Sequence, residues 1–339
     1  MDLHESRRLS LTPDLDICRV LNGMWQVSGA HGKIDSPKAI CAMFEYMDAG
    51  FTTWDLADHY GPAEDFIREF RRQLQVQRGE TAPSKLQILT RWAPYPERMT
   101  RQIVEDNINA LLHRIGADCL DVLQFHWWKY RDRNYIDALK YLMELQAEGK
   151  VRNLALTNFD TEHLQIVLDQ GVKIVSHQVQ YSLIDRRPEV AMIALCKQHD
   201  IKILAYGSLC GGLLSDRYLK QPEPEWSDLN TASLRKYKQM VTLWGGWALL
   251  QELLTGLSTI AQKHQVSIAN IALRYVLERP VVGGVIIGVR LGRSKHIQDN
   301  ARVFNFELDE ADYQQIESIL NQSRNLYKWI GDCGIEYRR

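Results

Sequence analysis

The sequence has few cysteines, and their positions exclude the two common structural uses of that residue. Only six of the 339 residues are cysteine, no C-x-x-C pair occurs, and no histidine stands near a cysteine at the spacing of zinc ligands. We therefore expect reduced thiols and no bound metal. The six are Cys18, Cys41, Cys119, Cys196, Cys210 and Cys333.

An excess of charge of one sign is also missing. The chain has 41 Lys and Arg against 42 Asp and Glu, interspersed along its length. Nucleic acids and anionic membranes attract a concentrated basic surface, so we expect neither as a partner. No apolar run approaches the roughly 20 residues that span a bilayer, and the N-terminus lacks the pattern of a signal peptide. We therefore expect a cytoplasmic protein.

The composition is that of an ordinary globular protein. Hydrophobic residues make up 45% of the chain and charged residues 24%, a balance that supplies a buried core without signalling disorder. A length of 339 residues exceeds that of most domains but suits an α/β barrel of about 250 residues with insertions. We predict one domain over 1–339, with the barrel over about 19–320.

Short β-branched runs alternate with amphipathic helical stretches along most of the chain, which is typical of a parallel sheet covered by helices. The predicted strands are Arg19–Leu21, Phe51–Trp54, Leu86–Thr90, Leu120–Phe125, Val151–Leu156, Ile174–Val179, Ile201–Ala205 and Val282–Ile287. Helices are predicted from Ser36, after Pro62, over Val104–Ile115, and near Tyr135, Thr161, Pro188 and Leu249.

Eight strands are the number that closes a barrel whose side chains fill its interior. An open doubly wound sheet is the rival architecture, and it normally carries a G-x-G-x-x-G turn after its first strand. Residues 22–28, Asn-Gly-Met-Trp-Gln-Val-Ser, contain no such turn. We therefore predict an α/β fold of the (β/α)8 TIM barrel type, with long connecting loops and a C-terminal extension.

Two segments depart from the regular alternation. The stretch 211–247 is too long for an ordinary loop, and we interpret it either as an excursion that covers substrate or as a solvent-facing insertion. A last helix is predicted from near Leu308 to near Leu320. The tail that follows, over 321–339, is expected to lie across the barrel mouth.

Polar residues that follow strands are the candidates for an active site, because the active site of such a barrel lies at the carboxyl ends of its strands. Asp55 and Tyr60 follow the second predicted strand, Arg91 the third and His126 the fourth. We expect all four side chains to face one pocket and to act in catalysis.

These residue types fit the reduction of a carbonyl group. Hydride addition creates an alkoxide that must be protonated, and a phenol with a pKa of about 10 loses its proton reluctantly. Arg91 would lower the pKa of Tyr60 and Asp55 would hold that cation. His126 would donate a hydrogen bond to the carbonyl oxygen. Taken singly, the carboxylate also fits a helix cap, the phenol a packed aromatic ring, and the imidazole a hydrogen-bonded core histidine.

In this order, the four residues resemble the catalytic set of the aldo-keto reductase family. The chain contains a family-like Asp-x-Ala-x-x-Tyr-Gly run over 55–61, and the resemblance extends from about Arg19 to Leu320. Its other motifs are Gly-Met-Trp at 23–25, Leu-Thr-Asn-Phe at 156–159, Gln-Val-Gln-Tyr-Ser at 178–182, Ala-Tyr-Gly-Ser-Leu at 205–209, and Gly-Val-Arg at 288–290 with Asp299 and Asn300.

The resemblance implies how a nicotinamide cofactor would bind. Thr157 or Asn158, together with Gln178, would hold the carboxamide, and Tyr206 would stack on the ring. Backbone amides over 207–213 would bind the pyrophosphate, because small residues let the main chain approach phosphate oxygens. The expected contacts there are Gly207, Ser208, Leu209 and Gly211.

At the adenosine end, the resemblance implies contacts from five residues. These are Gly288, Arg290, Arg293, Asp299 and Asn300. A guanidinium near the ribose suits a 2'-phosphate, so NADP(H) is favoured and NAD(H) is the alternative.

One residue departs from the family pattern. The cation after the third strand is ordinarily lysine in the family, whereas this chain has Arg91, whose planar fork differs from a compact ammonium. We predict an active NADP-dependent reductase that also oxidises the corresponding alcohols or sugars. The alternative is a cofactor-binding regulatory or interaction protein with weak or no turnover. A metal-dependent hydrolase needs several ligands at strand ends, and only His126 is firmly placed there.

Several tryptophans stand at or just after predicted strand ends and suggest an aromatic pocket for a small-molecule substrate. Trp25, Trp92 and Trp127 are the predicted substrate contacts, and Trp128 is adjacent to them. Such a pocket suits small aldehydes, ketones or sugars without choosing among them. The sequence leaves the oligomeric state open.

Overall fold

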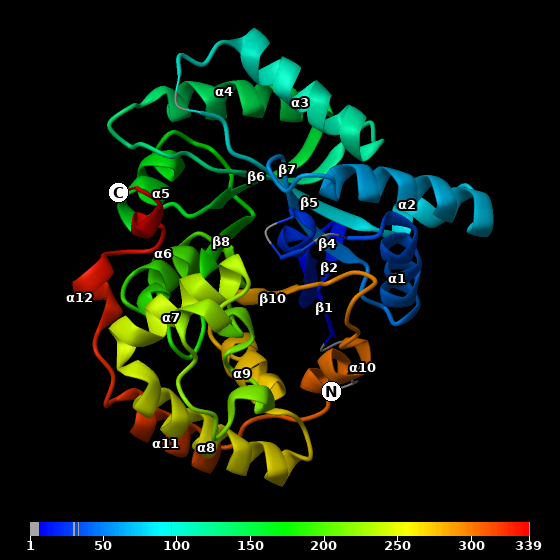
Figure 1. Ribbon diagram of the computed structural model, residues 1–339. Helices are drawn as coiled ribbons and strands as arrows, with labels where there is room; N and C mark the ends of the chain where they lie inside the picture. The colour runs from blue at the N-terminus through cyan, green and yellow to red at the C-terminus, as the bar shows by residue number, and fades with distance from the viewer. Residues whose placement is uncertain (1–6, 30, 33, 96, 339) are drawn as a thin grey trace.

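The computed structural model describes residues 7–29, 31, 32, 34–95 and 97–338, and its centre is a closed barrel of parallel strands (Figure 1). The strands close in the order β10-β3-β4-β5-β6-β7-β8-β9. Each predicted strand overlaps one of them, so the (β/α)8 prediction is confirmed. Their bounds are β3 Val20–Gly23, β4 Thr53–Ala57, β5 Gln87–Trp92, β6 Leu120–Phe125, β7 Val151–Thr157, β8 Ser176–Gln180, β9 Lys202–Tyr206 and β10 Val282–Gly288.

Alternation along each strand separates two buried layers. Successive strand side chains point to opposite faces, so one set fills the barrel and the other packs under the helices. Inside the barrel, Leu21, Leu89 and Val122 belong to one apolar cluster. Trp92 and Phe125 belong to the larger cluster between the barrel and its helices. A residue two positions after Leu89 or Val122 points to the same inner side, nearer to the mouth of the barrel.

A hairpin that the sequence did not reveal closes the opposite end. Strands β1 (Arg8–Thr12) and β2 (Leu15–Cys18) pair antiparallel. Leu11, Leu15 and Ile17 of this hairpin join the inner cluster of the barrel. The amino ends of the barrel strands are thereby capped by apolar side chains, which leaves the carboxyl ends as the functional face.

Helices alternate with the strands around the barrel. Their bounds are α1 Ser36–Asp48, α2 Ala63–Arg78, α3 Arg101–Ile115, α4 Asn134–Ala147, α5 Thr161–Asp169, α6 Met192–Gln198, α8 Gly246–His264, α9 Ile268–Leu277, α10 Ile297–Ala301 and α11 Glu310–Leu320. Short polar side chains begin several of them, and Asp35, Thr100 and Asp160 each accept a hydrogen bond from the first turn of their helix. Within the described ranges, no helix has both the length and the apolar character needed to cross a bilayer.

The helix expected near Pro188 begins later than predicted. Pro188 lies in a short 3-10 helix, η4 (Arg187–Glu189), and α6 starts at Met192. Ala191 separates the two because its φ of −145° is outside the helical region. The interruption leaves Arg187 buried, where it contacts the C-terminal tail.

The segment 211–247 is an ordered element that packs against the barrel mouth. It contains η6 (Asp216–Tyr218), η7 (Trp226–Asp228) and α7 (Ala232–Trp244). Tyr237 of α7 packs so closely on the turn at Gly207 that a Cβ atom there would overlap its hydroxyl. Helix α7 therefore packs against the turn after β9, and a role of the segment in covering substrate stays a prediction.

The C-terminal tail crosses the molecule after α11. It forms α12 (Leu326–Ile330) and then η9 (Ile335–Tyr337). In Figure 1 it runs in red to an end near α5. The backbone amide of Thr161, at the start of α5, donates to the Asp332 carboxylate at 2.8 Å. The tail therefore returns to the carboxyl-end face, as expected.

Candidate active site

The ends of the barrel strands bring Tyr60 and Arg91 into contact. Arg91 lies on the inner face of β5, and Tyr60 follows β4 in a turn closed by a backbone hydrogen bond to Ala57. The Arg91 Nη1 donates to the Tyr60 hydroxyl at 2.9 Å, and both residues are about nine-tenths buried. The expected pairing of phenol and cation is therefore present in the structure.

Burial and charge act in opposite directions on Tyr60. Burial raises the pKa of the phenol, and the positive charge of Arg91 offsets only part of that rise, so the net pKa lies above its ordinary value. Burial also opposes the charge of Arg91, but the neighbouring Tyr60 and Asp55 raise its pKa overall. Tyr60 thus keeps its proton at neutral pH, beside a guanidinium that stabilises the phenolate left after proton transfer.

Asp55 is held by amides instead of by the cation. Its Oδ1 accepts hydrogen bonds from the Nε2 atoms of Gln124, at 2.7 Å, and Gln178, at 2.6 Å. The ion pairs of the described part of the chain do not include one between Asp55 and Arg91. Gln178 stands between the two charges, because its Oε1 accepts from the Arg91 Nη2. The expected ion pair between Asp55 and Arg91 is thus replaced by hydrogen bonds between each of them and Gln178.

Gln124 was missed as a site residue. It is fully buried on the inner face of β6, and its Oε1 accepts a 2.7 Å hydrogen bond from Gln178. The signal was its position two residues before His126, which places it on the same side of the strand one layer deeper. We refer to Asp55, Tyr60, Arg91, Gln124 and Gln178 together as the strand-end cluster.

His126 is a neutral imidazole whose single N–H group is already hydrogen-bonded. Its Nδ1 lies 3.2 Å from the Thr157 carbonyl oxygen, which can only accept, so Nδ1 carries the hydrogen. Burial lowers the pKa of His126 to about 3, so a second proton on the ring is disfavoured. Its Nε2 is buried without a partner among the described atoms and offers a lone pair. This arrangement differs from the expected donor to a carbonyl oxygen.

The residues expected to hold the nicotinamide lie at neighbouring strand ends. Thr157 ends β7 with its Oγ1 buried and unpartnered within the residues that the structure describes. Asn158 follows it, with a φ of 57° that aims the side chain at β9, and its Oδ1 accepts from the Tyr206 hydroxyl at 2.8 Å. Gln178 is instead occupied within the strand-end cluster.

The stretch after β9 forms a tight turn through η5 (Cys210–Gly212). Gly207 and Gly211 have positive φ values, a conformation that turns successive amides toward one side and that glycine adopts without strain. Leu209 is half-buried in the same turn. The Ser208 side chain donates to the Tyr181 carbonyl at 3.0 Å, so this hydroxyl serves the turn itself.

The adenosine end of the expected site carries two exposed arginines. Neither Arg290 nor Arg293 is paired with a carboxylate in the described ranges. Arg293 lies against Gly32. Burial lowers the pKa of His31, and the positive charge of Arg290 lowers it further. Two unpaired guanidinium groups thus border the loop after β3.

The other residues predicted at this end have structural partners. The Asp299 carboxylate accepts from the Ser267 Oγ at 2.8 Å and from the Asn270 Nδ2 at 3.0 Å, at the start of α9. Asn300 is buried in α10. Gly288 ends β10 under the Gln26 side chain, where a Cβ atom would overlap the amide.

Two of the predicted substrate contacts are wrong. Trp92 and Trp127 are at most 1% exposed and pack in the layer between the barrel and the helices. The reason is alternation: Arg91 points into the barrel, so Trp92 points away from it. Trp128 instead lies edge-on to His126, with ring centres 4.4 Å apart. Trp25 stays half-buried beside His31.

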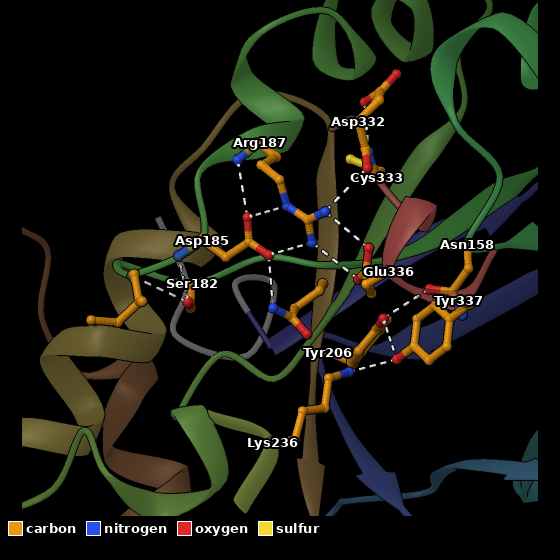
Figure 2. Close-up of polar contacts among 12 residues, drawn as sticks. Asn158, Ser182, Asp185, Arg187, Tyr206, Lys236, Asp332, Cys333, Glu336 and Tyr337 are labelled. Atoms are coloured by element: carbon orange, nitrogen blue, oxygen red, sulfur yellow. Dashed lines mark hydrogen bonds and ion pairs between the residues drawn. The ribbon is translucent and has the colours of Figure 1, made fainter. Parts of the chain in front are cut away.

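The C-terminal tail reaches the same mouth through a buried ion cluster (Figure 2). Arg187 pairs with Asp185 at 2.8 Å and with Glu336 at 2.9 Å. The side chains of Arg187 and Asp185 are each 1% exposed. We refer to Asp185, Arg187 and Glu336, with Tyr337 beyond them, as the tail cluster. No sequence motif indicated which tail residue would reach the barrel.

Tyr337 is the second member of a chain of hydrogen bonds that runs from Lys236 to Asn158 (Figure 2). Lys236 Nζ donates to the Tyr337 hydroxyl at 2.5 Å. The Tyr337 and Tyr206 hydroxyls are 3.0 Å apart, and Tyr206 gives its own proton to Asn158, so Tyr337 donates to Tyr206. The Tyr337 ring also lies edge-on to His126, with centres 6.2 Å apart. The tail therefore lies against Tyr206 and His126, two of the residues expected to contact the nicotinamide and the substrate.

Comparisons with known proteins identify the family of the chain. The model of the Aldo/keto reductase family matches residues 19–321. Flagellar radial spoke protein 5 of Chlamydomonas reinhardtii is 30% identical over 177 residues, which are 47% of this chain and 33% of that protein. NADH-specific methylglyoxal reductase of Escherichia coli is 21% identical over 89% of this chain and 94% of its own.

Solved structures share the fold. An aldo/keto reductase from Klebsiella pneumoniae, in complex with NADP and acetate, matches with a TM-score of 0.68 and 19% identity. The match covers 93% of this chain and 95% of that one.

Proposed function

This chain belongs to the aldo/keto reductase family, and we propose from that premise that it reduces aldehydes or ketones with hydride from NADPH and a proton from Tyr60. The observation that carries the proposal is the contact between the Tyr60 hydroxyl and the Arg91 guanidinium, buried at the ends of β4 and β5. A buried phenol beside a permanent cation combines a held proton with a stabilised conjugate base.

The proton balance follows from these two residues. A carbonyl oxygen that receives the Tyr60 hydrogen bond would take its proton as hydride reaches the carbon. The resulting phenolate would be stabilised by Arg91. The raised pKa of Tyr60 keeps the phenol protonated at neutral pH, so reduction needs no further proton uptake before the chemical step. In the reverse direction the phenolate is the base, so alcohol oxidation should rise with pH.

The residues present fit a nicotinamide dinucleotide, which when bound supplies the hydride. Thr157 has an unpartnered buried hydroxyl in the described structure, and with Asn158 it is suited to the carboxamide. Tyr206 offers a ring for stacking. The turn over 207–213 has the small residues and positive φ values of a phosphate cradle.

A preference for NADPH over NADH is supported by charge. Arg290 and Arg293 are exposed and pair with no carboxylate in the described ranges. Both guanidinium groups are therefore available to pair with a 2'-phosphate. The Klebsiella pneumoniae structure contains NADP, whereas the Escherichia coli relative is NADH-specific. Measured dissociation constants of NADPH and NADH would test this preference. Equal values for the two cofactors would contradict it.

The substrate pocket would lie between Trp25, Trp128 and Tyr337. His126 would contribute a lone pair from Nε2 to this pocket, and Tyr60 would be the donor to the carbonyl oxygen. An apolar, aromatic pocket with few polar groups suits small aldehydes, ketones or sugars. The corresponding alcohols would be substrates of the reverse reaction.

NADPH consumption with a panel of small aldehydes tests the proposal. Tyr60→Phe should lower kcat roughly 10²- to 10⁴-fold, the usual contribution of a general acid. Tyr46→Phe is a matched control, because it removes a buried phenol hydroxyl under the helices, away from the strand-end cluster. Equal rates in Tyr60→Phe and the wild type would overturn the assigned role. NADPH binding by a wild type that has no turnover would favour the regulatory alternative.

A further inference from the structure

We propose that the mouth of the barrel binds an anionic group of the substrate, and that Lys236 donates to this group while Arg338 adds a second positive charge. The substrates would then be aldehydes or ketones that carry a carboxylate or a phosphate. This inference rests on the proposed function and deepens it by naming the substrate class. It arises from two cations beside Tyr337 that form no ion pair with any described carboxylate.

Lys236 lies on α7 with most of its hydrogen-bonding capacity unused. Its Nζ donates to the Tyr337 hydroxyl at 2.5 Å. An ammonium has three donors, so two remain without a partner among the described atoms. The same atom lies 5.1, 5.3 and 4.9 Å from the ring centres of Tyr206, Tyr237 and Tyr337. Aromatic faces attract a cation without supplying a negative charge, so the ammonium is held in place but not neutralised.

Arg338 also has donors without acceptors. Its Nη1 donates to the Gly334 carbonyl oxygen at 2.8 Å, whereas its Nε and Nη2 are buried and make no hydrogen bond to any described atom. The guanidinium lies over the ring of Tyr130, with 4.1 Å between its Cζ and the ring centre. A partly buried charge that lacks an acceptor is costly, so an anion bound nearby would stabilise it.

Both cations lie at the face of the barrel that carries the candidate active site. The Tyr337 hydroxyl is 3.0 Å from that of Tyr206 (Figure 2), and the Tyr337 ring lies edge-on to His126. Burial lowers the pKa of His126, and the positive charge of Arg338 lowers it further. An anionic group a few bonds away from a carbonyl at Tyr60 would therefore meet this positive charge.

The carboxylates of the tail are bonded to other groups. Glu336 accepts from both terminal nitrogens of Arg187, at 2.9 and 3.0 Å. Asp332 accepts from the backbone amides of Thr161 and Cys333, at 2.8 and 2.7 Å. The two cations beside Tyr337 are thus left without a direct carboxylate partner in the described ranges. Positive charge at the mouth of a cleft raises the local concentration of an anionic ligand and orients it.

Pairs of aldehydes that differ in charge test the substrate class. Succinic semialdehyde and butanal share a four-carbon chain, and glyceraldehyde 3-phosphate differs from glyceraldehyde by its phosphate. In at least one pair, the wild-type kcat/KM should be roughly tenfold or more higher for the anion. The pair with the larger ratio identifies the anionic group as carboxylate or phosphate. Equal values within both pairs would overturn the inference and leave the reductase function standing.

Lys236→Met keeps the stem of the side chain and removes its charge. The ratio of kcat/KM for the anion to that for its uncharged partner should fall roughly tenfold, because a hydrogen bond to a charged group is lost. The change should lie in the KM of the anion and not in kcat. Lys238→Met is the matched control, since that lysine lies on the same helix and is already paired with Glu223. An equal fall for charged and uncharged substrates would contradict the assignment.

Arg338→Met should lower the same ratio by a smaller factor, about threefold, because this residue adds charge at a greater distance. Arg324→Met is its control: it removes an exposed tail arginine that forms no ion pair in the described structure, and the ratio should not change. The NADPH dissociation constant should stay within about threefold in Lys236→Met and Arg338→Met. A tenfold rise in that constant with an unchanged substrate ratio would assign the cations to the cofactor phosphates and overturn the proposal.

Calorimetric titration gives a test that does not need turnover. Succinate and glycerol 3-phosphate are analogues of the two anionic aldehydes that lack the carbonyl to be reduced. In the presence of NADPH, at least one should bind the wild type, and roughly tenfold more weakly bind Lys236→Met. Binding of neither, or equal binding to both proteins, would overturn the anion site even if the enzyme is active. Weakened binding to the variant in a protein without turnover would support the anion site while refuting the proposed function.

Discussion

The strand-end cluster and the tail cluster are both buried polar networks around an arginine, but they treat the cation differently. Arg187 is paired directly with two carboxylates, Asp185 and Glu336. Arg91 contacts a phenol and an amide and has no ion pair with a carboxylate in the described ranges, while Gln178 bonds both Arg91 and Asp55. The first arrangement neutralises its cation, whereas the second leaves the charge acting on Tyr60.

This difference indicates a division of labour between the two clusters. Two direct carboxylate partners satisfy a buried guanidinium and fix the tail across the barrel mouth. An amide-bridged cation is less fully neutralised, so its field remains available where charge develops during the reaction. Substitutions in the strand-end cluster should therefore change catalysis more than stability, and those in the tail cluster should do the reverse.

The largest effect is expected from Arg91→Met. It removes the donor and the charge beside Tyr60, so kcat for aldehyde reduction should fall roughly 10²- to 10³-fold, as when an oxyanion donor is removed. Steady-state NADPH oxidation measures the loss. Arg91→Lys is the control that keeps the charge and should retain more activity. The comparison fails if Arg91→Met lowers the unfolding free energy but not kcat.

Next in size is Arg187→Met in the tail cluster. It leaves the Asp185 and Glu336 carboxylates buried without their cation, so the free energy of unfolding should fall by about 3–5 kcal/mol. Urea denaturation at pH 7 measures this change. Arg186→Met, at a neighbouring and more exposed arginine, should cost clearly less. A larger effect on kcat than on stability would contradict the division between the clusters.

A smaller effect, and one that depends on pH, is expected from Glu336→Gln. Burial raises the pKa of Glu336, but its bonds to Arg187 outweigh that and lower the pKa overall. A carboxylate whose pKa is lower in the folded state adds stability above its unfolded pKa and loses it as the pH falls through its folded pKa.

The variant should therefore be less stable than the wild type at pH 7 by about 1.5–3 kcal/mol, the value of a hydrogen bond to a charged group. Denaturant titrations at a series of pH values test this. The gap should close at acidic pH, below the ordinary glutamate pKa of about 4.3. A gap that is constant with pH would mean that Glu336 acts by packing alone.

The smallest effect is expected from Arg293→Ala. Arg293 lies outside both clusters, is exposed, and pairs with no carboxylate in the described structure. If this guanidinium meets a 2'-phosphate, the NADPH dissociation constant should rise roughly tenfold while that for NADH stays the same. Fluorescence titration with both cofactors measures it. Lys295→Ala, a cation already paired with Glu45, is the matched control.

Alternation explains which side chains of the strand ends could be predicted. Asp55, Arg91 and His126 follow recognisable strands, and the structure brings Asp55 and Arg91 to the same interior. Trp92 and Trp127 occupy similar sequence positions but lie on the outer face. A position near a strand end is thus necessary for a site residue but not sufficient. Adjacent residues point in opposite directions, so only every second side chain points into the barrel.

The contacts of the tail cluster could not be predicted from the sequence. Glu336 and Tyr337 lie about 150 and 130 residues from their partners Arg187 and Tyr206. No periodicity connects such distant positions, and Gly334 fits against the Asn158 carbonyl only because it lacks a Cβ atom and has a φ of 77°. The contact depends on how the whole chain is folded.

The sequence by itself therefore determined the eight-stranded barrel and placed Tyr60 and Arg91 among the strand-end residues, because hydrophobic periodicity and local motifs are properties of neighbouring residues. Only the tertiary structure decided the partners of that cation. The direction of the Gln178 amide, the tautomer of His126 and the position of Tyr337 each depend on atoms from separate strands or from the tail, and burial makes those long-range contacts decisive.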